Sequence, residues 1–110
     1  MTLTNTGART FHDNIGTSAE TWGFSEKSRR VRIRNKHASQ AVYATVNTSR
    51  RSSALQEAGI VAAVAAADET IYIPPGGLAV EVFNSNSPVY VGGSIISVGG
   101  ASDCDFEADA

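Results

Sequence analysis

The sequence has a single cysteine, Cys104, and only two histidines, His12 and His37. One cysteine excludes an internal disulfide bond and a metal site built from thiolates, but leaves open a cross-link between two chains. Acid–base and nucleophilic catalysis require a base within hydrogen-bonding reach of a nucleophile, and no pattern places either histidine beside one. We therefore expect a protein that is not an enzyme, with no catalytic residues and no cofactor.

Long hydrophobic runs are also missing. The longest apolar stretch, residues 59–67, is rich in alanine and far shorter than the roughly 20 residues of a membrane helix. Residues 1–7 contain neither the basic nor the apolar region of a signal peptide. We expect no membrane partner, and a chain made in the cytoplasm that does not leave by the general secretory route.

No basic residue follows Arg51. Residues 1–51 hold all nine lysines and arginines and three acids, a net charge of +6, whereas residues 52–110 hold eight acids and no base, a net charge of −8. This asymmetry indicates pairing between copies of the chain or binding to a charged partner. The dense acids of residues 103–109 do not have the central glycine and final glutamate of a calcium loop, so we expect no metal site.

Several short apolar segments have the pattern of β-strands. Apolar and basic residues alternate strictly over residues 30–35, and further strands are predicted at 21–24, 41–47, 69–73, 78–83, 89–91 and 94–98. Short strands with a turn every 8 to 12 residues favour an all-β, antiparallel β-sandwich, Ig-like or jelly-roll-like. For residues 54–67 a short helix and an irregular crossover both remain open.

The turns between these strands predict two hairpins. Residues 30–35 and 41–47 would pair across a loop of about five residues. Residues 71–73 and 78–83 would pair across Pro74-Pro75-Gly76-Gly77, where a type II turn would place Gly76 at positive φ. Gly92 and Gly93 would form a bulge or bend between two strands.

The two ends of the chain have less regular patterns. We expect an extended N-terminal arm at residues 1–16, a β-sandwich domain at 17–102 and an acidic C-terminal tail at 103–110. Phe11 would anchor the arm on a neighbouring chain, unless the arm is simply frayed. The tail has two interpretations, an acidic strand or a disordered segment.

The strand at residues 30–35 carries the most distinctive local feature, because its arginines would all project from one face. Like charges on one face repel unless opposite charges compensate them, and the acidic tail is the first candidate partner, within the chain or between chains. Nucleic acid is an unlikely partner because the whole chain is mildly acidic. The predicted protein-interface residues are Phe11, Arg30, Arg32, Arg34, Asp103, Asp105 and Glu107.

The order of strands and turns at residues 31–35, 42–46, 67–77 and 87–91 resembles small virion structural proteins of tailed bacteriophages, particularly capsid decoration or cement proteins. The resemblance covers about residues 20–100 and lies in the style of strands and turns. It implies a β-sandwich assembled in the host cytoplasm, bound to the capsid surface of the virion, bridging and stabilising neighbouring capsomers. The implied partners are the major capsid protein and the chain itself, as a dimer or trimer.

A second function remains open, a carbohydrate-binding or adhesion module of a tail or fibre. Such modules expose aromatic side chains to a sugar, and the candidates here are Trp22, Tyr43, Tyr72 and Tyr90.

Overall fold

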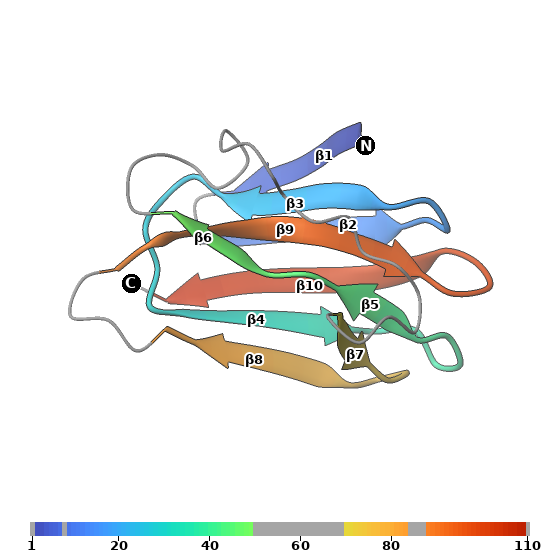
Figure 1. Cartoon of the computed structure of the whole chain (residues 1–110). Helices are drawn as coiled ribbons and strands as arrows, with labels where there is room; N and C mark the ends of the chain where they lie inside the picture. The colour runs from blue at the N-terminus through green and yellow to red at the C-terminus, as the bar shows by residue number, and fades with distance from the viewer. Residues whose placement is uncertain (1, 8, 50–69, 84–87, 110) are drawn as a thin grey trace.

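The computed structural model describes residues 2–7, 9–49, 70–83 and 88–109, and over these residues the chain is all-β (Figure 1). Two sheets pack as a sandwich, which confirms the predicted fold class. Sheet A contains β1 (Thr2–Gly7), β3 (Glu20–Phe24), β5 (Val42–Ala44), β6 (Asn47–Ser49), β7 (Ile71–Ile73) and β9 (Tyr90–Ser97). Sheet B contains β2 (Thr10–Ile15), β4 (Arg30–Asn35), β8 (Leu78–Val82) and β10 (Ser102–Asp109). No helix in the described part of the chain is long and apolar enough to cross a membrane.

The strand order brings distant parts of the sequence side by side. Sheet A has the order β1-β3-β9-β5-β7, with β6 also paired to β9, and sheet B has the order β2-β10-β4-β8. All of these pairs are antiparallel except β1 with β3. In sheet B the last described strand, β10, therefore lies between the second and the fourth.

Alternating side chains from the two sheets build the core. In β4, Val31 and Ile33 are buried while Arg30 and Arg34 are exposed, as the alternation predicts. Burying apolar surface of this kind supplies the main favourable term in folding. The largest fully buried apolar side chains are Trp22, Phe24, Phe106, Ile15, Ile73 and Ile95.

Both predicted hairpins are wrong. β4 pairs with β10 and β8 in sheet B, whereas β5 pairs with β7 and β9 in sheet A. The loop after β4 and the turn after β7 therefore each carry the chain from one sheet to the other. A strand's partner depends on the whole fold, which explains why neighbours in sequence that are joined by a short loop need not pair.

The turn at Pro74–Gly77 has the predicted local geometry. The Gly77 amide donates a 2.8 Å hydrogen bond to the Pro74 carbonyl, and Gly76 has a φ of 69°. The buried side chain of Asn35 holds this corner, because its Nδ2 donates to the carbonyls of Gln40 at 2.7 Å and of Pro74 at 3.3 Å. The turn thus links two sheets instead of two strands of a hairpin.

The pair Gly92-Gly93 does not interrupt a strand. β9 runs through both glycines and pairs there with Trp22 and Gly23 of β3. A Cβ atom on Gly93 would lie 1.9 Å from the Thr45 carbonyl oxygen, so the backbones approach too closely for any larger residue. The predicted bulge is corrected to a close contact between backbones.

The structure also corrects the predicted domain boundaries at both ends. In the described part of residues 1–16, β1 pairs with β3 and β2 pairs with β10. Residues 102–109 form β10, so the acidic segment is a strand in the middle of sheet B. In β2 and β10 alternate side chains point inward and complete the sandwich core, which places these two strands inside the domain. Residues 54–67, with their two open interpretations, lie outside the described residues.

Candidate functional site

The outer face of sheet B carries charged side chains in rows along its strands; we call it the charged face. From β10 it presents the alternate acids of residues 103–109, and from β4 the alternate arginines of residues 30–34. The two strands are neighbours, with Arg30 opposite Asp109, Arg32 opposite Glu107 and Arg34 opposite Asp105. Basic residues from the first half of the sequence therefore lie next to acidic residues from the second half within one chain.

Two of the arginines are paired with these acids. The Arg30 Nε donates a 2.6 Å hydrogen bond to an Asp109 oxygen. The Arg32 guanidinium lies 2.9 Å from Glu107 and 3.3 Å from Asp109. The hydrogen bond from Arg30 and the charges of both arginines hold the pKa of the Asp109 carboxyl below its ordinary value of 3.8. The positive charges of Arg30 and Arg32 are thus compensated by acids of the same chain.

A second cluster lies further along the same face. Asp105 accepts from His12 Nδ1 at 3.1 Å and from Lys36 Nζ at 3.1 Å, and His12 Nε2 lies 3.6 Å from Asp103. Burial of the Asp105 carboxyl acts to raise its pKa, but the hydrogen bonds from His12 and Lys36 outweigh it and lower the pKa below 3.8. The Asp105 carboxylate is therefore bound by His12 and Lys36, and not by Arg34, the residue opposite it on β4.

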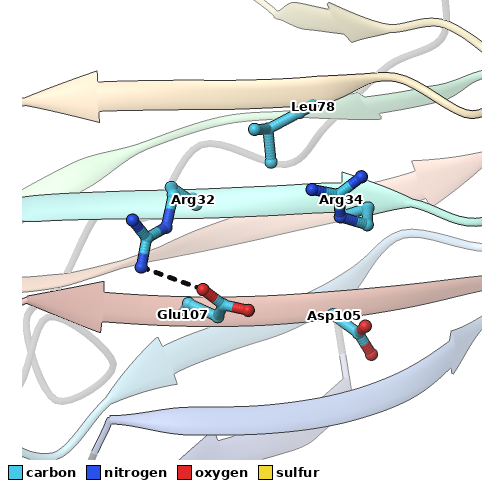
Figure 2. Close-up of a pocket in the computed structure, with 5 residues that line it drawn as sticks. All are labelled: Arg32, Arg34, Leu78, Asp105 and Glu107. Atoms are coloured by element: carbon cyan, nitrogen blue, oxygen red, sulfur yellow. Dashed lines mark ion pairs between the residues drawn. The ribbon is translucent and has the colours of Figure 1, made fainter.

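Arg34 is left without an acidic partner among the described residues. It borders a shallow hollow of about 300 Å³ that is also lined by Arg32, Leu78, Asp105 and Glu107. Figure 2 shows Arg32 directed toward Glu107, while Asp105 points away from Arg34. The hollow therefore offers one uncompensated guanidinium beside an exposed apolar side chain, Leu78.

Phe11 does not belong to this face. Its ring packs against the core, stacked on Phe106 with centroids 4.6 Å apart, and lies 5.2 Å from the ring of Phe24. Phe11 was predicted to anchor a neighbouring chain because the sequence suggested that residues 1–16 form an arm outside the domain. In the structure Phe11 packs within its own chain, while the other predicted interface residues lie on the charged face.

Cys104 is fully buried between β2 and β4, and this burial raises the pKa of its thiol to about 12. The thiolate is the form that reacts in disulfide exchange, so a cross-link between native chains through Cys104 is disfavoured.

The sequence reasoning did not predict that the apolar row on β8 is exposed. Leu78, Val80 and Val82 are 45%, 47% and 68% exposed, and they continue the charged face to the edge of sheet B. Their alternation with Ala79 and Glu81 normally indicates an apolar side turned to the core. Here Ala79 and Glu81 face inward instead, and only the pairing with β4 reveals this.

Three of the four aromatic candidates for a sugar platform fall into two groups. Trp22 is buried and its Nε1 donates to the Ser94 carbonyl at 3.1 Å, so it is part of the core. Tyr43 and Tyr72 lie side by side on β5 and β7 with ring centroids 5.3 Å apart, and Tyr72 is 53% exposed.

No group of three or more acids, histidines or cysteines within the described ranges is arranged to hold a metal ion. Comparison of the chain with protein-family models, curated proteins and solved structures finds no match in any of the three. The function must therefore be inferred from the residues of this chain.

Proposed function

We propose that this chain is a non-enzymatic structural protein of a virion, of the capsid decoration type, which attaches to the shell through the charged face. The strand-and-turn style of the sequence supports the virion part of this proposal. The contact part depends on one observation, the uncompensated Arg34 at a hollow beside the exposed Leu78.

The chemistry of the hollow defines the partner group. A guanidinium next to an apolar side chain suits a carboxylate that is flanked by apolar residues, because the charge and the apolar surface are then both matched. Exposed charge pairs contribute more to specificity and orientation than to affinity, so attachment at many copies of one shallow site supplies the overall strength. A regular shell presents such repeated sites.

The proposal is tested first on the genes that flank this one, which should encode a major capsid protein with a scaffold or protease. Shells assembled from that capsid protein should retain the wild-type chain in a density gradient. Arg34→Glu should reduce retention at low salt, whereas the control Lys27→Glu, which makes the same charge change at an exposed residue 5.5 Å from the ring centroid of Tyr90, should not. Flanking genes unrelated to virions would contradict the proposal. So would shells that fail to retain the wild-type chain.

The second candidate function, carbohydrate binding in a tail or fibre, is favoured by the Tyr43–Tyr72 pair. One exposed ring face beside a second tilted ring can stack against a sugar. Binding to an oligosaccharide array that is lost in Tyr72→Ala and retained in Arg34→Glu would favour this function over capsid attachment.

A further inference from the structure

Within the part of the chain that the structure describes, the second edge of β8 has no partner strand. Among the described strands β8 pairs with β4 alone, and Figure 1 shows it at the outer edge of sheet B. Hydrogen bonds from the Asn35 amide to Gly77 and from the Phe83 amide to Arg29 bracket this pairing, each at 2.9 Å.

These two bonds fix the direction of every peptide group along β8. In an antiparallel pair, amides alternate between facing the partner and facing away. The backbone groups of Ala79 and Glu81 consequently face β4. Those of Leu78, Val80 and Val82 face away from β4, along the open edge.

The same three residues carry the exposed apolar row of the charged face. Natural edge strands are commonly protected by lysine, proline or a bulge, because open backbone groups template pairing with another chain. Residues 78–82 contain no lysine or proline. Glu81, their one charged residue, points to the inner side of the strand, a placement that also protects some edge strands, and leaves the outward row without a charge.

We propose that two copies of this chain join by antiparallel pairing of their β8 strands about Val80, so that the two sheets B become one continuous sheet. In this register Val80 faces Val80 of the second copy, and Leu78 faces Val82. Ala79 faces Glu81, so the two glutamates are not opposite each other. Every outward pair is then apolar, which makes the strand complementary to itself.

The charges around β8 favour a second copy over a charged foreign strand. Two of the three arginines that lie next to β8 on β4, Arg30 and Arg32, are already paired with acids of β10, which among the described residues leaves Arg34 as the one unpaired charge beside Leu78. The β4 strands of the two copies would be separated by three strand spacings, about 14 Å, where screening in physiological salt is strong. A foreign strand with charges facing Leu78, Val80 and Val82 would bury those charges against apolar side chains.

Sedimentation of the full chain over a range of concentrations tests the pairing, which does not depend on the proposed function. Wild type should show a monomer–dimer equilibrium, and Val80→Lys should weaken it at least about tenfold, because two lysines would meet at the two-fold axis. Val98→Lys, the same change at a valine that is 41% exposed in the bend after β9, should leave the equilibrium unchanged.

A second variant tests the pairing without introducing a charge, in case the lysine of Val80→Lys disturbs folding. Val80→Pro removes an amide that faces away from β4, so the β4–β8 pairing is retained while the open edge is blocked. Both variants should keep the wild-type circular dichroism spectrum, and the Val80 amide of wild type should exchange more slowly as the protein concentration rises. A wild-type chain that stays monomeric, or Val80 variants that dimerise like wild type, would overturn the proposal.

Discussion

The ring of Phe11 stacks on the ring of Phe106, with centroids 4.6 Å apart and planes 11° from parallel. This contact ties the second strand of the chain to the tenth and gives the N-terminal segment a role in the stability of a single molecule. Phe11→Ala should therefore lower the free energy of unfolding by about 2 to 3 kcal/mol, somewhat less than for a fully buried phenylalanine. Urea unfolding of the isolated chain measures this loss.

Phe11→Leu is the matched control, since it keeps apolar volume and should lose less stability than Phe11→Ala. If Phe11→Ala unfolds like wild type but no longer associates with a partner, Phe11 is an interface anchor instead.

The pair Arg32–Glu107 should contribute a small, salt-dependent stabilisation. The two side chains are 30% and 47% exposed, so a double-mutant cycle with alanine should give a coupling of about 0.5 kcal/mol at low salt, because solvent screens a half-exposed pair. The coupling should shrink as salt rises. A coupling of zero at low salt would mean that the cross-strand pair is not formed in solution.

Acid should destabilise the domain through Asp105. Its pKa is lowered in the folded chain below 3.8, so the stabilisation is present above about pH 4 and is lost as the pH falls through the folded pKa. Thermal unfolding between pH 2 and pH 6 should show a steeper fall for wild type than for Asp105→Asn, which cannot titrate at this position. Parallel curves for the two proteins would argue against the cluster with His12 and Lys36.

Gly76 should tolerate asparagine but not valine. Its φ of 69° falls in the left-handed region, where β-branched residues are strained and asparagine is accepted. No atom outside the turn lies within 4 Å of a Cβ built on Gly76, so the cost arises from the backbone alone. Gly76→Val should lose about 1 to 3 kcal/mol of stability, and Gly76→Asn much less. Equal melting temperatures for the two variants would contradict a type II turn.

The sequence predicts the strands well and their partners poorly. The alternation at residues 30–35 determines which side of β4 is buried, and the Pro-Pro-Gly-Gly run determines the turn, because both are local properties. The partner of β4 is instead decided by β10, almost 70 residues later in the chain. No local pattern indicates that contact, so the predicted hairpins failed.

The candidate site shows the same division. The arginine row and its acidic partner segment could be predicted from charge and period, and the structure places them on adjacent strands. The exposure of Leu78, Val80 and Val82 could not, because an apolar row on an edge strand has the same sequence pattern as a row that faces the core. The packing of Phe11 could not be predicted because its partner Phe106 lies in a segment with too many acids to suggest a central strand.

The central position of β10 in sheet B sets the order in which this protein can fold. Until β10 has been synthesised, β2 has no partner in sheet B, and the β4–β8 pair stands apart from it. The pairing of β10 with β2 joins residues about 90 positions apart, and contacts of such long sequence separation are typical of slow-folding β-proteins. During that interval the apolar edge of β8 and the inner face of β4 are exposed together, so this stage of synthesis is the one at which the chain is most prone to aggregate.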